Sequence, residues 1–164
     1  MFSSDQSKPQ KIYDRKTAKL KAADYCAYQE RSQQQVRDKL YDYGLHQDEV
    51  EEVLTELIME GFINEERFAR AFVGGKFRMK KWGRKKILQG IKPHKISEYC
   101  IKKGMEEIDH DEYWEVLLTH ASKKYDQLKG NNIYVIKGKL TQYLYGKGFE
   151  SDLIVEAVDQ VTKD

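Results

Sequence analysis

Hydrophobic residues recur along this chain at the three- and four-residue spacing of amphipathic helices. The clearest example has apolar residues at i, i+3, i+4, i+7 and i+8 and acids on its other face: Val50, Val53, Leu54, Leu57 and Ile58. Proline occurs only at Pro9 and Pro93, and the helix-favouring residues Lys, Glu, Gln, Leu and Ala are abundant. The pattern therefore predicts an all-α fold.

Residues suited to cap helices mark where further helices begin and end. Ser32 and Asn64 are good N-caps, Gly44 suits the left-handed position that follows a helix, and Gly61 ends the helix before Asn64. We expect a first helix from about Lys16 and a second after Ser32. The other long helices are expected near residues 65–79, 111–129, 133–147 and 151–162.

One apolar pattern occurs three times, the second and third copies lying 51 and 104 residues after the first. The matching sets are Val36, Leu40, Leu45, Val50 and Leu54; Ile87, Ile91, Ile96, Ile101 and Met105; and Leu140, Leu144, Phe149, Ile154 and Val158. Gly44 and Gly148 occupy the same turn, whereas the middle copy has Lys95 there with Pro93 just before it, so we expect that turn to differ. Three copies of one three-helix unit explain the pattern most economically.

The repeats define the expected domain organisation. We expect a flexible N-terminal tail over residues 1–15, then helical repeats over residues 16–63, 64–109 and 110–164. Because a unit of about 50 residues has little stability alone, neighbouring units should pack on one another. The predicted fold is all-α, with three tandem three-helix repeats in an elongated array.

Charged residues are sorted into blocks although the net charge is only +2. Residues 42–66 contain many acids and no Lys or Arg, and residues 67–86, here called the basic tract, contain no acid. The tract has nine cations, which we expect to have no acidic neighbours: Arg67, Arg70, Lys76, Arg78, Lys80, Lys81, Arg84, Lys85 and Lys86. Such a one-sided cluster indicates a polyanion or an acidic protein as partner.

Aromatic residues lie among these cations. Phe77 and Trp82 could stack on unpaired bases if they are exposed, so the candidate partner-binding residues are the nine cations and Trp82. The alternative is a solvated helix surface with the aromatic residues in the core. We expect Phe68, Ala71 and Phe72 to face inward, and the sequence does not decide between the two positions for Trp82.

No motif indicates an enzyme, a metal site or a membrane protein. Cys26 and Cys100 lie in apolar helical patterns typical of buried cysteines, and the four histidines lack metal-ligand spacing. Phosphate-binding and nucleophile motifs are missing, and the acidic blocks fit solvated helix faces. The chain has no apolar leader segment or membrane span. We expect a reduced, cytoplasmic, monomeric protein without enzymatic activity, cofactor or metal.

The residues at the start of the basic tract resemble a family signature. The stretch Gly61–Val73, GFINEERFARAFV, is similar to the signature of the RecX family of bacterial recombination regulators. Further matches are Ala22–Tyr25, Val36–Leu40 and Gly83–Ile87, and the similarity covers about residues 17–160. Gly90, Pro93, Lys95 and Gly138 depart from the usual family pattern.

The resemblance implies three tandem three-helix repeats. It also implies a protein that binds the RecA recombinase filament on single-stranded DNA and restrains its assembly, ATP hydrolysis and strand exchange. An alternative function is a helical DNA-binding module that acts independently of RecA, because helix-turn-helix-like units with a basic tract permit that.

Overall fold

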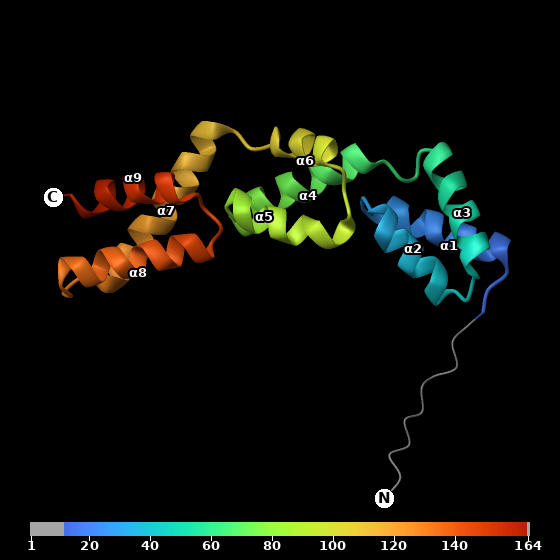
Figure 1. The fold of residues 1–164 in the computed structure, drawn as a ribbon, viewed down its shortest axis with the longest axis horizontal. Coiled ribbons are helices and arrows are strands. Elements are labelled where there is room, and N and C mark those ends of the chain that lie inside the picture. Colours follow the sequence, from blue (N-terminus) through green and yellow to red (C-terminus); the bar gives the residue numbers. More distant parts are fainter. Residues whose placement is uncertain (1–11, 164) are drawn as a thin grey trace, which may run out of the picture. The chain divides into compact units, whose positions relative to one another are not determined.

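The computed structural model describes residues 12–163, and all the regular structure in that part of the chain is helical (Figure 1). The helices are α1 (Arg15–Tyr28), α2 (Gln33–Asp42), α3 (Gln47–Met59), α4 (Glu65–Lys80), α5 (Arg84–Ile91), the 3-10 helix η1 (Lys92–His94), α6 (Glu98–Met105), α7 (His110–Leu128), α8 (Ile133–Gly146) and α9 (Ser151–Thr162). The predicted all-α fold of three tandem three-helix repeats is confirmed: α1–α3 form repeat 1, α4–α6 repeat 2 and α7–α9 repeat 3. The expected elongation of the array stays a prediction.

Side-chain caps set the starts of these helices. Ser32 Oγ accepts a hydrogen bond from the Gln35 backbone N–H at 3.1 Å, and the Gln35 side chain accepts one from the Ser32 N–H at 2.9 Å. Asn64 Oδ1 accepts from the Arg67 N–H at 2.8 Å. Each bond satisfies a backbone donor that the first helical turn leaves free. Both caps were predicted, and the helices begin where the caps place them.

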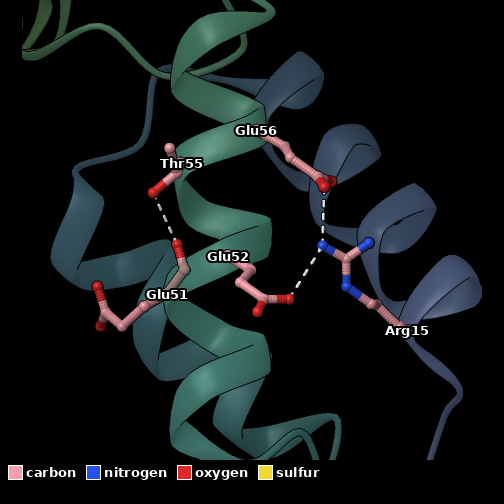
Figure 2. A pocket seen from close by; sticks show the side chains of 5 residues that line it. All are labelled: Arg15, Glu51, Glu52, Thr55 and Glu56. Carbon is pink, nitrogen blue, oxygen red and sulfur yellow. Dashed lines mark hydrogen bonds and ion pairs between the residues drawn. The ribbon is translucent and has the colours of Figure 1, made fainter.

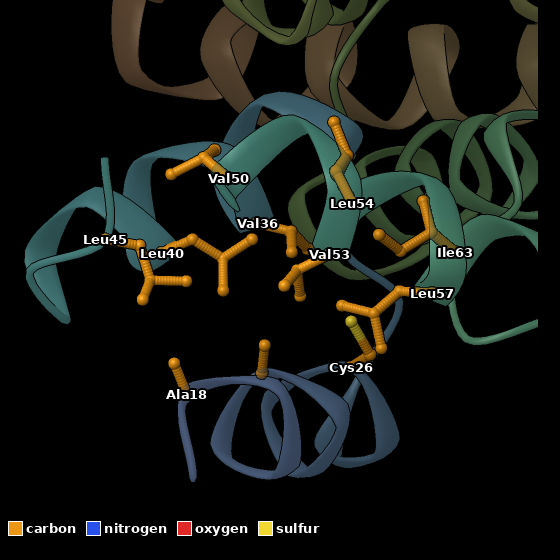
Figure 3. Packing of buried hydrophobic residues seen from close by; sticks show 11 residues of the cluster. Ala18, Cys26, Val36, Leu40, Leu45, Val50, Val53, Leu54, Leu57 and Ile63 are labelled. Carbon is orange, nitrogen blue, oxygen red and sulfur yellow. The ribbon is translucent and has the colours of Figure 1, made fainter. Parts of the chain in front are cut away.

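The chain divides into two compact units, with the boundary between Phe68 and Ala69 inside α4. In the first unit, α1, α2 and α3 pack against one another around a buried apolar cluster (Figure 3). The cluster consists of Ala18, Ala22, Cys26, Val36, Leu40, Leu45, Val50, Val53, Leu54, Leu57 and Ile63. Burying each large aliphatic side chain of such a cluster contributes about 1.5–3 kcal/mol.

The expected N-terminal tail lies mostly outside the described residues, since residues 1–11 are not part of the description. Tyr13, near its end, packs against the repeat 1 cluster, and its N–H donates to the Tyr43 carbonyl at 2.9 Å. Asp14 then caps α1 by accepting from the Thr17 N–H at 2.7 Å. The residues just before α1 are therefore held on repeat 1.

The second unit contains the rest of repeat 2 and repeat 3. In repeat 3, each of α7, α8 and α9 contacts the other two. Their buried side chains include Leu117, Leu140, Leu144 and Ile154. The expected helices of this repeat agree with the observed ones to within one residue at each end.

The matched apolar positions of the three repeats differ in burial. All five are buried in repeats 1 and 3. In repeat 2, Ile87 and Ile91 are fully buried, whereas Ile96, Ile101 and Met105 are half-buried. Because α5 and α6 have only 8 residues each, they cover less surface than the corresponding helices of the other repeats.

The turn between the second and third helices keeps a left-handed residue in every repeat. Gly44 has φ +92 and Gly148 has φ +95, and Lys95 takes the same region with φ 54. The repeat 2 turn differs, as expected, in that η1 comes before Lys95 and contains Pro93. Repeat 2 therefore has a lysine, Lys95, in a backbone conformation that ordinarily favours glycine.

Within the second unit, the loop before α5 makes backbone hydrogen bonds with the turn between α8 and α9. The Gly83 N–H donates to the Lys147 carbonyl at 2.8 Å, and the Lys85 N–H donates to the Gly148 carbonyl at 2.9 Å. These bonds fix the start of α5 against repeat 3.

Candidate nucleic-acid interface

The basic tract comprises most of α4, the loop at residues 81–83 and the first residues of α5. The apolar face of α4 is formed by Phe68, Ala69, Val73 and Phe77, all buried. Phe77 is only 2% exposed, so the suggestion that it stacks on bases is wrong. The core position of Phe68 is confirmed.

The buried face of α4 is rotated from the expected one. Ala71 is exposed, so the inward position expected for it is wrong. Phe72 is half-buried, so its side chain is only partly in the core. The cause is a close contact with α6, where a Cβ on Gly104 would lie 2.7 Å from the Ala69 carbonyl oxygen. Ala69 lies against this backbone because it is small. Phe72 instead meets the His94 ring at a centroid distance of 5.5 Å.

Four arginines of the tract form ion pairs, so the expectation that the tract has no local neutralisation is wrong for them. The pairs are Arg67 with Glu30, Arg70 with Glu106 and Glu107, Arg78 with Glu107, and Arg84 with Glu150. These pairs could not be predicted from local patterns, because the acids lie outside the tract, 29 to 66 residues away along the chain. The more exposed of these pairs, such as Arg78 with Glu107, contribute only about 0–1 kcal/mol each. All of the pairs reduce the local positive field of the tract.

The five tract lysines differ from the arginines. Lys76, Lys80, Lys81, Lys85 and Lys86 form no ion pair with any residue that the structure describes. Three of them, Lys80, Lys81 and Lys85, are exposed, and the other two are half-buried. The uncompensated charge of the tract therefore lies around the corner between α4 and α5.

Trp82 is half-buried at this corner. The Nζ atoms of Lys76 and Lys86 lie 5.0 and 4.7 Å from the centroid of its ring. A Cβ on Gly90 of α5 would lie 3.3 Å from the indole, so the ring packs on α5. Ammonium groups at this distance from an indole are attracted by its π electrons, which holds the two lysines near the ring.

The loop at residues 81–83 is held by repeat 3. Lys81 has φ 58, which is uncommon for a residue other than glycine. Its carbonyl lies 2.9 Å from His120 Nε2, which donates to it when the ring is in the Nε2–H form. Burial lowers the pKa of His120, the hydrogen bond to the Lys81 carbonyl raises it by less, and Lys147, Lys123 and Lys81 lower it further. The net lowering of the pKa favours the neutral ring.

Arg84 is held within the protein. Its guanidinium carbon lies 3.9 Å from the ring centroid of Tyr113, and Nη1 lies 3.5 Å from Glu150 Oε1. The Tyr113 hydroxyl donates to Glu150 Oε2 at 2.8 Å and accepts from the Arg84 N–H at 3.1 Å. Burial raises the pKa of Tyr113, which keeps its hydroxyl protonated and able to donate.

Sequence reasoning missed His120, Tyr113 and Glu150 as residues that shape the tract. Each belongs to repeat 3 and lies 29 to 66 residues from its partner in the tract. No local pattern connects residues so far apart. An alignment showing paired changes at these positions is the kind of signal that finds such contacts.

A hollow in repeat 1 contains several carboxylates but does not form a catalytic pair (Figure 2). Arg15 Nη2 lies 2.7 Å from Glu56 Oε1 and 3.5 Å from Glu52 Oε2, and the Thr55 hydroxyl donates to the Glu51 carbonyl. Hydrogen bonds from Arg15 and Lys19 lower the pKa of Glu56, so this carboxyl is ionised at neutral pH. The Glu56 carboxylate is therefore held by two cations.

The cysteines and the possible metal ligands form no further site in the described part of the chain. Cys26 and Cys100 are buried, as predicted, and burial raises the pKa of Cys26 to about 11. Within residues 12–163, no three His, Cys, Asp or Glu side chains come together as metal ligands. In the same part of the chain, no helix is both long and apolar enough to cross a lipid bilayer.

Comparison with known proteins identifies three matching domains in order. Models of the first, second and third three-helix domains of RecX match residues 18–57, 64–105 and 111–158. The crystal structure of RecX from Lactobacillus salivarius is similar in fold, with a TM-score of 0.81 and 23% identity over 90% of this chain and 96% of that one.

Two relatives are each named regulatory protein RecX. The protein from Streptococcus uberis is 30% identical over 131 residues, which are 79% of this chain and 50% of the relative, so this chain spans half of its length. The protein from Chlorobium phaeobacteroides is 31% identical over 132 residues, which are 80% of this chain and 85% of the relative. Because all three domain models match in sequence order and a relative of comparable length agrees, the chain belongs to the RecX family.

Proposed function

We propose that this protein is a regulator that binds the RecA filament on single-stranded DNA and restrains RecA assembly and ATP hydrolysis. Membership of a family whose members are named regulatory proteins supports a regulatory role. We infer the contact with the filament from one observation. The five tract lysines around the α4–α5 corner form no ion pair with described residues. Such lysines suit a polyanionic partner.

The tract lysines contact phosphates of the DNA in this proposal. Each lysine that meets a phosphate of a single strand releases condensed cations, so the logarithm of the binding constant falls by about 0.7 per contact for each tenfold rise in salt. Five contacts give a slope of about −3.5. Trp82 adds aromatic surface next to Lys76 and Lys86.

The four tract arginines have a supporting role. Their positive charge adds to the field of the tract, and exposed pairs such as Arg78 with Glu107 are exchanged for a phosphate at little cost. Arg84, which packs on Tyr113, positions the start of α5. We therefore expect the lysines to determine affinity and Arg84 to determine the shape of the surface.

The proposed regulator acts by binding rather than by catalysis, as a monomer in the cytoplasm, where RecA filaments form on DNA. Binding energy alone shifts an assembly equilibrium when the ligand prefers one state of the filament.

Charge reversal tests the proposal. We expect a variant with Lys80, Lys81, Lys85 and Lys86 changed to Glu to lose inhibition of DNA-dependent ATP hydrolysis by RecA and to keep its helical circular dichroism. The matched control changes four lysines outside the tract that form no ion pair with described residues: Lys16, Lys102, Lys139 and Lys163. The control should inhibit as the parent protein does. Full inhibition of RecA by the tract variant at physiological salt would contradict the proposal.

A second candidate function is a DNA-binding module that acts without recognising RecA, and the same uncompensated lysines favour it. The two functions differ in stoichiometry. A filament regulator inhibits at protein concentrations far too low to cover the DNA. A simple DNA-binding module inhibits only when the DNA is covered.

A further inference from the structure

A second group of lysines lies in repeat 3, outside the basic tract. Lys123 and Lys124 belong to α7, and Lys147 follows α8. The Nζ atoms of Lys124 and Lys147 lie 5.0 and 5.4 Å from the ring centroid of Tyr143. These three residues are here called the repeat 3 lysines. Lys124 and Lys147 thus share one aromatic ring, and Lys123 is adjacent to Lys124 in α7.

His120 connects this group to the basic tract. Its ring lies 6.4 Å from that of Tyr143, centroid to centroid, and its Nε2 atom lies 2.9 Å from the Lys81 carbonyl oxygen. Lys81, Lys123 and Lys147 are all close enough to act electrostatically on His120. Charges of both the tract and repeat 3 therefore act on the same imidazole.

A second contact extends the connection along α5. Lys85 Nζ lies 5.3 Å from the ring centroid of Tyr145, which is 58% exposed and belongs to α8. The backbone bonds from Gly83 to Lys147 and from Lys85 to Gly148 hold the two elements in this register. Lys81 and Lys85 of the tract thus lie directly beside repeat 3.

Nearby acids do not neutralise the repeat 3 lysines. Within residues 12–163, none of the three forms an ion pair. Asp126, on the same helix as Lys124, pairs with Lys129 at 3.1 Å. Glu150, close to Lys147 in sequence, is bound by Tyr113 and Arg84. The positive charge of this region is left for a partner from outside the chain.

The arrangement suits a polyanionic chain better than a compact anion. A compact anion needs several donors that converge on one point, whereas these ammonium groups are distributed over Trp82, Tyr145 and Tyr143. A single strand of nucleic acid presents phosphates at intervals, and its unpaired bases can meet exposed aromatic rings such as Tyr145.

We propose that a single strand of DNA bound by the basic tract continues onto repeat 3, where Lys123, Lys124 and Lys147 contact its phosphates. His120 is a positioning residue that holds Lys81 between the two groups of lysines. Its hydrogen bond stabilises the left-handed conformation of Lys81. The inference rests on the proposed function, because it assigns a longer DNA path to the same surface.

Salt-dependent DNA binding tests the path. The probe is a fluorescein-labelled oligo(dT), titrated with the full chain at several NaCl concentrations and followed by anisotropy. Changing Lys123, Lys124 and Lys147 to Gln should weaken binding and make the salt slope less steep by about 2, since each lost phosphate contact removes about 0.7. The control changes Lys16, Lys102 and Lys139 to Gln and should leave the slope unaltered. An unaltered slope in the repeat 3 variant overturns the inference.

The same proteins separate failure of this inference from failure of the proposed function. If the parent protein inhibits RecA and the repeat 3 variant retains the parent salt slope, the inference is wrong and the proposed function stands. If the parent inhibits RecA but does not bind oligo(dT) at low salt, the inference is also wrong, and an acidic protein surface is the partner of these lysines. If the parent neither inhibits RecA nor binds the oligonucleotide, both fail.

Two variants test the positioning role of His120. His120→Ala removes the donor to the Lys81 carbonyl and should reduce oligo(dT) affinity severalfold with little change in the salt slope, because no lysine is lost. His120→Gln retains an N–H donor and should restore most of the affinity. Equal losses in the two variants, or no loss in either, would contradict the assigned role.

Discussion

A Cβ atom on Gly83 would lie 2.3 Å from the carbonyl carbon of Gly148, closer than side-chain atoms come to a backbone. The two glycines let the loop before α5 pass directly against the turn between α8 and α9, where two backbone hydrogen bonds form. The basic tract consequently takes its shape at the α4–α5 corner from repeat 3.

Gly83→Ala should destabilise the protein because the added methyl group has no space beside the Gly148 backbone. We expect a loss of about 1–3 kcal/mol in the free energy of unfolding, the usual cost of overpacking. Urea denaturation followed by circular dichroism measures it. Gly138→Ala, in an open position of α8, is the control and should stabilise by up to about 1 kcal/mol. Unchanged stability of Gly83→Ala would contradict the close contact.

Tyr113→Phe should also destabilise the second unit. The hydroxyl is buried, donates to Glu150 and accepts from the Arg84 N–H, so its removal leaves both groups without this partner. The expected cost is about 1–3 kcal/mol. Tyr134→Phe changes a residue that is 82% exposed and should leave the melting temperature unaltered. If Tyr113→Phe and Tyr134→Phe have the same melting temperature, the hydrogen bonds of the Tyr113 hydroxyl contribute nothing to stability.

Lys95→Gly should stabilise repeat 2. Lys95 has φ 54, a region that costs residues with a Cβ about 1 kcal/mol or more and that glycine adopts freely. The gain should be up to about 1 kcal/mol because glycine also loses more entropy on folding. Lys92→Gly is the matched control, since Lys92 is right-handed and the same change there should destabilise. A lower melting temperature for Lys95→Gly would count against the assigned conformation.

Acid should weaken the fold through two histidines. Burial lowers the pKa of both His94 and His120 below the usual 6.5, so the folded protein favours their neutral forms. Their contribution to stability is complete above pH 6.5 and is lost as the pH falls below 6.5 towards the lowered pKa values. Unfolding free energies between pH 7.5 and 5.5 measure this loss. A variant with His94→Asn and His120→Asn should lose less stability over that range; an equal loss would refute the explanation.

The repeats and the helix caps could be predicted from the sequence because both depend on local patterns. Ser32 and Asn64 act on backbone donors three residues away, and the apolar spacing directly reflects the helical period. The orientation of α4 was less predictable, because Ala69 and Ala71 differ only in their position relative to Gly104 of α6.

The composition of the candidate site could be predicted only in part. The clustering of cations was visible in residues 67–86, but their partners were not. Arg84 meets Glu150, and Lys81 meets His120, across 66 and 39 residues of chain. Such contacts depend on how repeats 2 and 3 pack within the second unit, which no local pattern records.

The most direct test of the proposed function compares binding to RecA filaments with binding to bare DNA. Fluorescently labelled protein is titrated with preformed RecA filaments on single-stranded DNA and, separately, with the same DNA alone at physiological salt. We predict tighter binding to the filament, and loss of that binding when Lys80, Lys81, Lys85 and Lys86 are changed to Glu. Equal affinity for filament and bare DNA, or filament binding unaffected by the four changes, would contradict the account.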